Sequence, residues 1–484
     1  MEKSVFQQVR DAFTPVLPVG LRTAVGIKEG EATTSVADQE VIKKMFPNTY
    51  GMPVVEFVEG EERGTDPINV GVILSGGQAP GGHNVITGLF DTIKKINPHS
   101  RLFGFLLGPG GLVDHKYIEI TETYINDFRN TGGFDMIGSG RTKLEKEDQF
   151  EKGYEILKYL NIKALVIIGG DDSNTNACVL AEYYKMKNYP VQVIGCPKTI
   201  DGDLKCEQIE ASFGFDTATK VYSELIGNIE RDCNSSRKYW HFVKLMGRSA
   251  SHIALECALQ CHPNLCLISE EVEAKDLSLN DIVEDICRMV KYRSDRGMNY
   301  GVVLIPEGLI EFIPAIGRLI DELNDLLALH GKDYKDLSPM EQKQYILEHL
   351  SEENLKTFET LPDDVARQLS LDRDPHGNVQ VSLIETERRE WWMQSCRPGK
   401  KKGSLMEAST LSIISSVMRD VALRLPISTQ TIAMLLEQVQ PISSPTARLA
   451  IWQWCAILQP NQQIGKRVEC LSRRSLTWND AMAR

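Results

Sequence analysis

One unit recurs along this sequence and limits the folds it can form. In that unit a short apolar run ends in glycines or polar residues and leads into a helical segment. The run 164–168 (ALVII) ends in the sequence GGDDSNTNA, 169–177. Similar apolar runs cover 69–74, 102–106, 191–195 and 301–305. Continuously apolar strands separated by helices indicate a parallel sheet covered on both faces, so the sequence predicts an α/β fold. Ligands of such sheets bind beyond the carboxyl ends of the strands, where these turns fall.

Length and charge limit the class of protein. With 484 residues, of which 42% are hydrophobic, the chain can form two or more lobes. A net charge of −12 argues against nucleic acid or an anionic membrane as the main partner. No apolar stretch approaches the roughly 20 residues of a membrane span, and the N-terminus lacks the apolar core of a signal peptide. We therefore expect a cytoplasmic protein with neither nucleic acid nor membrane as a partner.

The sequence divides into four predicted regions. Residues 1–65 form an N-terminal extension, 66–270 a first α/β lobe, 271–387 a second lobe and 388–484 a tail of different composition. Within the second lobe, residues 310–371 are charged and helical in pattern, which predicts a helical insertion without a ligand loop.

Two glycines follow the first buried strand. Gly76 and Gly77 leave backbone N–H groups available at the start of the helix expected over 85–96, a geometry that suits an anion. The alternative is a purely steric role, because many tight strand-to-helix turns contain two glycines.

Asp171 and Asp172 come directly after the strand 164–168. Adjacent carboxylates repel one another, and Mg²⁺ shared with phosphate oxygens would relieve that repulsion. The alternative is a helix N-cap aspartate beside a solvated neighbour.

The sequence PKTIDGD follows the strand 191–195. Thr199 can offer a hydroxyl to a phosphate and Asp203 a carboxylate to a sugar hydroxyl, while Asp201 could accept a proton as a general base in phosphoryl transfer. An Asx turn built on aspartate and glycine explains the same residues without chemistry.

Further polar residues flank later apolar segments. They are Lys238, Tyr239, Met246, Gly247, Arg248 and Glu307. Cationic side chains such as Arg248 suit phosphate monoesters, and Glu307 could accept hydrogen bonds from sugar hydroxyls. Taken singly, each fits an ordinary surface residue equally well.

Six motifs stand in order along the chain: LSGGQAPGGHNV, GGDDSNTNA, GCPKTIDGDL, FGFDTA, MGRSASHIA and PEGLIE. In this order they closely resemble the phosphofructokinase family, specifically its diphosphate-dependent branch, from about residue 70 to 387. The resemblance implies two lobes of parallel sheets covered by helices. It also implies reversible transfer of phosphate from diphosphate to the 1-hydroxyl of fructose 6-phosphate, giving fructose 1,6-bisphosphate and phosphate.

Position by position, the resemblance assigns the donor site and the base. It implies that Gly76 and Gly77 cradle diphosphate, Asp171 binds Mg²⁺, and Arg141 bridges the transferred phosphate. Asp201 would take the proton from the sugar hydroxyl.

The resemblance also assigns a sugar phosphate site. Its residues would be Thr199, Ile200, Asp201, Asp203, Met246, Gly247, Arg248 and Glu307. Lys238 and Tyr239 would reach into a neighbouring subunit's site, which implies a homo-oligomer of at least two chains, or a hetero-oligomer with a regulatory subunit.

Two residues bear on the choice of donor. ATP-dependent relatives resemble GGDGS and PGTID, whereas here Asp172 and Lys198 replace the two glycines. Asp172 would repel the α-phosphate of a nucleotide, and Lys198 adds a cation suited to compact diphosphate. Both are therefore expected to take part in catalysis with diphosphate, and ATP is the alternative donor.

The tail departs from the family. Residues 391–484 hold 12 Lys and Arg against 5 Asp and Glu, whereas the rest holds 42 against 61, and five of the six tryptophans lie in the tail. The family's Gly-Tyr-Glu-Gly-Arg loop, which the resemblance implies grips the 6-phosphate, is missing. Permitted codons for 417–422, shifted by one base, encode Tyr-Glu-Gly-Arg-Cys, and 471–482 shifted likewise resemble a later family helix.

We therefore hypothesise that the chain leaves its frame near 388–391, with a basic accessory domain as the alternative. The coding DNA across codons 385–395 decides between them. Without the loop, weak binding of fructose 6-phosphate is expected, with a tail that is disordered or loosely helical. An inactive or regulatory subunit stays a second class of function, although the intact Asp171 and Asp201 favour a catalytic ancestry.

Overall fold

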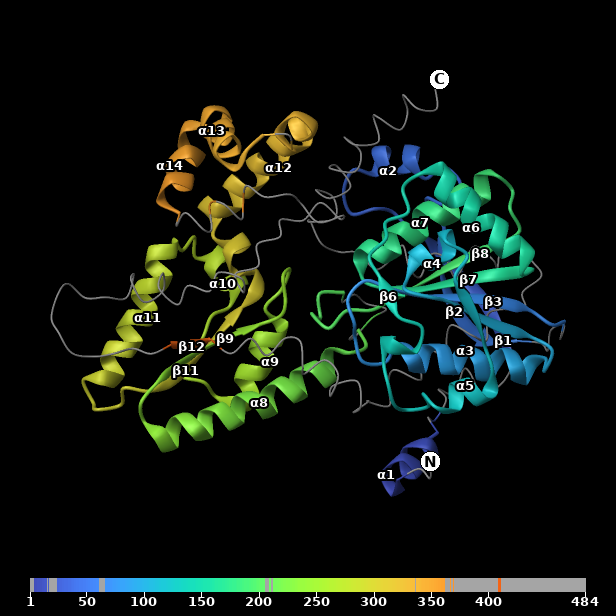
Figure 1. Ribbon diagram of the computed structural model, residues 1–484, viewed down its shortest axis with the longest axis horizontal. Coiled ribbons are helices and arrows are strands. Elements are labelled where there is room, and N and C mark those ends of the chain that lie inside the picture. The colour runs from blue at the N-terminus through green and yellow to red at the C-terminus, as the bar shows by residue number, and fades with distance from the viewer. Residues whose placement is uncertain are drawn as a thin grey trace. The chain divides into compact units, whose positions relative to one another are not determined.

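A computed structural model describes residues 4–14, 16, 24–60, 66–204, 209, 212–335, 337–361, 366, 369 and 408–410 (Figure 1). Two compact units divide the chain, and each is described by itself. The first holds residues up to 200 together with 204–217, and the second holds 201–203 and the described residues from 218 onward. Among the described helices, none is long and apolar enough to cross a membrane.

A six-stranded sheet organises the first unit, in the order β5-β4-β3-β7-β8 with β6 paired to β3. Its strands are β3 (Asn69–Ser75), β4 (Arg101–Phe105), β5 (Tyr117–Ile120), β6 (Ser139–Gly140), β7 (Ile162–Gly169) and β8 (Gln192–Pro197). All pairings are parallel except that of β5 with β4. The predicted parallel sheet is confirmed, and four of its strands follow the apolar runs of the sequence.

Helices cover both faces of this sheet. They are α3 (Gly82–Ile96), α4 (Pro109–Val113), α5 (Glu122–Asn126), α6 (Glu147–Tyr159) and α7 (Asp171–Met186), with a 3₁₀ turn η2 (Phe134–Met136). Figure 1 shows α6 and α7 on one face and α3 and α5 on the other. One core cluster joins Phe103, Phe105 and Leu165 of the sheet to Phe150 and Tyr184 of these helices. Burial of these large apolar side chains stabilises the unit.

The N-terminal extension contains more structure than its pattern predicts. Helix α1 (Val5–Asp11) precedes an antiparallel pair, β1 (Val25–Ala32) with β2 (Pro53–Glu59), and α2 (Gln39–Met45) lies between the two strands in sequence. The extension is tied to α7 through Glu182, whose carboxylate accepts hydrogen bonds from the amide of Asn48 and the hydroxyl of Thr49. Because Glu182 is buried, these bonds satisfy a charge that would otherwise be costly.

A four-stranded parallel sheet organises the second unit, in the order β10-β11-β9-β12. Its strands are β9 (Trp240–Leu245), β10 (Leu265–Cys266), β11 (Gly301–Pro306) and β12 (Ala408–Thr410). Its helices are α8 (Phe215–Ser236), α9 (His252–Cys261), α10 (Ser269–Ala274), α11 (Leu279–Ser294) and α12 (Pro314–Lys335), with a 3₁₀ turn η3 (Glu307–Phe312). Figure 1 shows α8 and α9 on one face of the sheet and α10 and α12 on the other.

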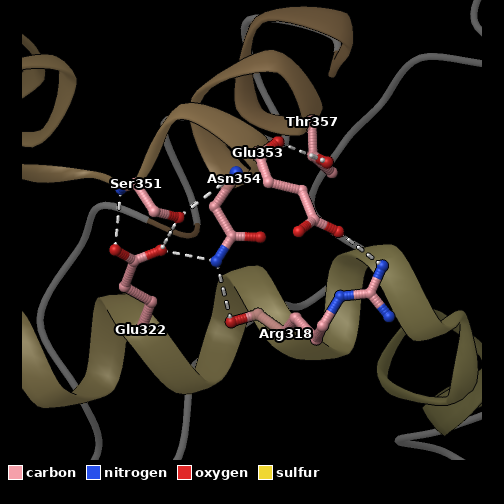
Figure 2. Close-up of polar contacts among 6 residues, drawn as sticks. All are labelled: Arg318, Glu322, Ser351, Glu353, Asn354 and Thr357. Atoms are coloured by element: carbon pink, nitrogen blue, oxygen red, sulfur yellow. Dashed lines mark hydrogen bonds and ion pairs between the residues drawn. The ribbon is translucent and has the colours of Figure 1, made fainter.

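Three described helices lie within residues 310–371, the range predicted to be a helical insertion. They are α12, α13 (Pro339–His349) and α14 (Glu352–Thr360). Figure 2 shows how α12 holds α14: the carboxylate of Glu322 accepts hydrogen bonds from the backbone and hydroxyl of Ser351, at 2.7 and 2.8 Å, and from the side chain of Asn354. Arg318 of α12 forms an ion pair with Glu353 at 3.0 Å.

The boundary between the two units differs from the predicted one at residue 270. The first unit ends at residue 217, because β9 and α9 pack with β11 in the second sheet. Strand β9 carries the sequence WHFVKL, whose histidine and lysine interrupt the apolar run, so the sequence pattern did not identify it as a sheet strand.

Candidate active site

The turn after β3 is the first element of the site. Gly76 has a φ of +84°, a conformation that favours glycine, and its amide donates to the carbonyl of Gly140 at 3.0 Å. This bond and the pairing of β6 with β3 place Arg141 beside the turn. A Cβ atom on Gly77 would lie 3.7 Å from a guanidinium nitrogen of Arg141. The structure therefore brings together Gly76, Gly77 and Arg141, three of the four residues predicted to hold diphosphate.

The turn after β7 places both aspartates in the first turn of α7. The N-cap residue of this helix is Gly170, so neither Asp171 nor Asp172 is the N-cap, and the N-cap alternative is not what the structure shows. A Cβ atom on Gly169 would lie 2.4 Å from Cβ of Ser173, which explains why glycine is needed there. Both carboxylates are half-buried at a helix N-terminus, where negative charge is favoured.

A buried hydroxyl pair joins these two turns. Ser173 donates through Oγ to Oγ of Ser75 at 2.8 Å, across 98 residues of sequence. No sequence pattern predicts this contact, because serine is common at both strand ends and helix starts. Its consequence is that the glycine turn and the aspartate turn are held at a fixed separation.

Lys198 is connected to both turns. Its side chain is only 7% exposed, and its Nζ donates to the carbonyl of Gly77 at 2.7 Å. Its backbone amide donates to the carbonyl of Gly169 at 2.8 Å. A buried ammonium so close to the glycine turn supplies positive charge where the anion is predicted to bind.

Sequence reasoning assigned no role to His83, in the first turn of α3. Its side chain is fully buried, and both ring nitrogens lack a hydrogen-bond partner among the described residues. Burial lowers the pKa of His83 to about 3, so the ring is neutral at physiological pH. The histidine is therefore an unusual polar group inside the donor half of the site.

In the second unit, the turns after β9 and β11 are in direct contact. The amide of Gly308 donates to the carbonyl of Gly247 at 3.0 Å. A Cβ atom on Gly308 would lie 1.8 Å from the carbonyl oxygen of Arg248, so any other residue would force the turns apart. The structure thus brings Gly247 and Arg248 next to Glu307, and the role of these three residues in a sugar phosphate site stays a prediction.

Tyr222 of α8 links the remaining predicted residues of this unit. Burial raises the pKa of Tyr222 to about 12, with further contributions from Asp201, Cys257 and Glu307. Its hydroxyl donates to the sulfur of Met246 at 3.4 Å. Asp201 and Glu307 are therefore both near one phenol that sequence reasoning did not single out.

The other predicted residues have the following positions. Thr199 accepts a hydrogen bond at its carbonyl from Ser212 at 2.6 Å, Ile200 is buried and Asp203 is half-buried. Lys238 is exposed and Tyr239 half-buried, directly before β9. Their roles toward a neighbouring subunit stay a prediction.

With this geometry in place, comparison with known proteins decides the family. The phosphofructokinase family matches residues 69–355, more than half of the chain. This chain belongs to the phosphofructokinase family. The match spans the donor turns and the second-unit turns alike.

Relatives of this phosphofructokinase carry one activity in their names. A pyrophosphate–fructose 6-phosphate 1-phosphotransferase of Porphyromonas gingivalis is 64% identical over 80% of this chain and 71% of its own length. The enzyme of the same name from Treponema pallidum is 52% identical, over 80% and 70% respectively. A protein of Arabidopsis thaliana, named as subunit beta 1 of that enzyme, is 50% identical over 80% and 68%.

Most of the tail lies outside the described residues. Of the tail, the structure describes 408–410, where β12 pairs in parallel with the start of β9. The other predictions for the tail, including those for 417–422 and 471–482, lie outside the described residues.

The residues of this phosphofructokinase fit a magnesium ion shared with substrate. Among the described residues no three acidic, histidine or cysteine side chains cluster as a closed metal cage. Mg²⁺ in phosphoryl-transfer sites is usually bound by one or two carboxylates plus phosphate oxygens, and the two adjacent carboxylates at the start of α7 suit that arrangement.

Proposed function

We propose that this chain transfers a phosphoryl group from diphosphate to the 1-hydroxyl of fructose 6-phosphate, giving fructose 1,6-bisphosphate and phosphate in a reversible reaction. The observation that carries the proposal is the buried Lys198 ammonium hydrogen-bonded to the carbonyl of Gly77, in the turn that also contacts Arg141. Two cations at a glycine turn suit a small, highly charged anion. The names of the relatives support the same substrates.

Each residue has a defined task in the proposed reaction. Asp201 takes the proton of the 1-hydroxyl as its oxygen bonds to the transferred phosphorus. The bond from that phosphorus to the bridging oxygen breaks, and phosphate leaves. Lys198 and Arg141 balance the charge that shifts onto the leaving oxygens. Asp171 would hold Mg²⁺, which neutralises negative charge on diphosphate when it is bound.

The acceptor is held by the turns of the second unit. Arg248 would pair with the 6-phosphate, and Glu307 would accept hydrogen bonds from sugar hydroxyls. Thr199 and Asp203 would border the reacting end of the sugar. The strict glycine requirement at Gly308 supports this assignment, because it keeps Glu307 next to Arg248.

ATP is the second candidate donor, and Asp172 is the residue that argues against it. Its carboxylate, half-buried in the first turn of α7, would repel and crowd the α-phosphate of a nucleotide. Diphosphate has no such group.

Initial rates with each donor test the proposal at saturating fructose 6-phosphate. The unchanged chain should turn over diphosphate at least tenfold faster than ATP, a difference of about 1.4 kcal/mol in the barrier. Asp172→Gly should raise the ATP rate relative to the diphosphate rate. Equal rates with the two donors in the unchanged chain would refute the assignment.

We further infer a cytoplasmic homo-oligomer, with Lys238 and Tyr239 contributing to a second subunit's site. Hetero-oligomerisation with a regulatory chain is the alternative, which the name of the plant relative as a subunit supports. Light scattering of the purified chain distinguishes a monomer from an oligomer, and mixing inactive Asp201→Asn chains with Lys238→Ala chains tests sharing of sites. Recovered activity in the mixture is the expected result, and no recovery contradicts shared sites.

A further inference from the structure

Lys244 of the second unit carries an ammonium group that is shielded from solvent. It is the fifth residue of β9, two positions before Met246. Its Nζ is shielded from solvent and has no hydrogen-bond partner among the described residues. A buried ammonium without a partner is costly, so its presence calls for an opposing charge close by.

The register of the sheet shows where the lysine lies. Lys244 pairs with Ile305 of the parallel strand β11. Side chains alternate along a strand, so Lys244 lies on the same face as Trp240 and Phe242, which belong to the apolar core. The aliphatic stem of Lys244 can therefore pack along that core while the ammonium extends toward the carboxyl edge. At that edge β11 ends and Glu307 follows, two residues beyond Ile305.

Electrostatics identify the partner. Burial lowers the pKa of Lys244, and the negative charge of Glu307 opposes that shift. The neighbouring phenol of Tyr222 does not compete for this carboxylate, because its hydroxyl donates to Met246. Glu307 is therefore the acidic group whose negative charge acts on the buried ammonium.

We propose that Lys244 is a positioning residue, whose ammonium holds the carboxylate of Glu307 at the sugar site so that it accepts hydrogen bonds from the acceptor's hydroxyls. The inference rests on the proposed function and adds a residue that the sequence motifs did not include. Lys244 does not itself touch substrate in this account. It supplies a fixed positive charge near the carboxylate, at a position where water cannot stabilise that carboxylate.

Three variants test the proposal in the full chain. Lys244→Met keeps the length of the stem and removes the charge, and it should raise the KM for fructose 6-phosphate about tenfold. The KM for diphosphate and kcat should stay within twofold. Lys244→Arg should restore most of the affinity for the sugar phosphate. Lys291→Met, at an exposed ion pair of α11 in the same unit, is the matched control and should change nothing.

A double-mutant cycle with Glu307→Gln separates positioning from general packing. If Lys244 acts through Glu307, the double variant should bind fructose 6-phosphate no more weakly than whichever single variant has the lower affinity for it. Independent, multiplying losses would overturn the proposal, as would an unchanged KM in Lys244→Met.

The same double-mutant cycle can be measured by the hydrogen-exchange protection of β9 and β11, which requires no catalytic turnover. Less protection lost in the double variant than the two single losses combined supports the pairing, and additive losses refute it. If the unchanged chain turns over no substrate, the proposed function is refuted. The hydrogen-exchange measurement still decides whether Lys244 is coupled to Glu307.

Discussion

The donor turns of the first unit and the sugar turns of the second unit are built differently. The donor turns are cross-linked by side chains: Ser75 to Ser173, and Lys198 to Gly77. The sugar turns are joined by one backbone hydrogen bond and by the close approach of Gly308 to Arg248. The predicted donor groups thus lie on turns of one sheet that side chains tie together, whereas the turns after β9 and β11 are held by backbone contacts.

The two halves are expected to differ in their sensitivity to the tail. Residues 75–198 contain all the predicted donor groups. The second sheet, by contrast, includes β12, whose three described residues belong to the tail. Val417, where the shifted frame would begin to encode Tyr-Glu-Gly-Arg, follows Thr410 by seven residues. An altered tail should therefore weaken the sugar site and leave the donor site intact.

Replacing the proposed base should lower the rate of the chemical step without changing the binding of diphosphate. Asp201→Asn removes the proposed base with little change in shape, and kcat should fall by about 10² to 10⁴. Binding of diphosphate, measured by calorimetry, should be unchanged because Asp201 lies outside the donor turns. A kcat within threefold of the unchanged chain would show that another group accepts the proton.

A smaller effect is expected from pH, and in the donor half it comes from His83. The pKa of His83 is lowered to about 3 in the fold, against about 6.5 when unfolded, so protons favour the unfolded chain as pH falls below 6.5. Stability contributed by the neutral ring is fully present above that pH. At pH 5 the loss should be about 2 kcal/mol.

Hydrogen exchange of β3 and α3 at pH 7.5 and pH 5 measures this loss directly. His83→Leu should abolish most of the difference between the two pH values, whereas His99→Leu, at an exposed histidine, should leave it in place. A pH response that persists in His83→Leu would assign acid sensitivity of the first unit to other groups.

The smallest effect concerns the helical insertion of the second unit. Burial opposes ionisation of Glu322, but hydrogen bonds from Asn354 and Ser351 outweigh it and lower its pKa. Glu322→Ala should destabilise the packing of α14 on α12 by about 1 to 2 kcal/mol, because it leaves those donors unpaired.

The matched control is Glu353→Ala, which removes an exposed ion pair with Arg318 and should cost no more than about 0.5 kcal/mol. Urea unfolding of the second unit, followed by the fluorescence of Trp240 in a full-length chain whose five tail tryptophans are replaced by phenylalanine, compares the two. Equal losses would mean that the Glu322 contacts contribute no more than a surface ion pair.

Much of the fold was predictable, because buried parallel strands are apolar on both faces and stand out in the sequence. Strands β3, β7 and β11 follow such runs. Strand β9 did not, since His241 and Lys244 interrupt its pattern, and the boundary between units was misplaced as a result. The antiparallel pair of the N-terminal extension carries many exposed residues and gave no continuous apolar signal.

The candidate site was predictable only in part, and for a similar reason. Motifs identify residues such as Asp171 and Arg248, because each lies in a short run of residues that together form a predicted binding turn. The contact of Ser75 with Ser173 and the pairing of Lys244 with Ile305 join positions more than 60 residues apart and depend on how the chain folds. One sequence does not fix that arrangement, so these residues became visible only in the structure.

The most direct test of this account is calorimetric titration of two chains with magnesium diphosphate and with fructose 6-phosphate. One chain has the present sequence, and the other carries the tail encoded by the shifted frame from codon 388 onward. We expect equal affinity for diphosphate and at least tenfold tighter binding of fructose 6-phosphate by the second chain, about 1.4 kcal/mol. Equal binding of fructose 6-phosphate by both chains, or a change in diphosphate binding, would contradict the account.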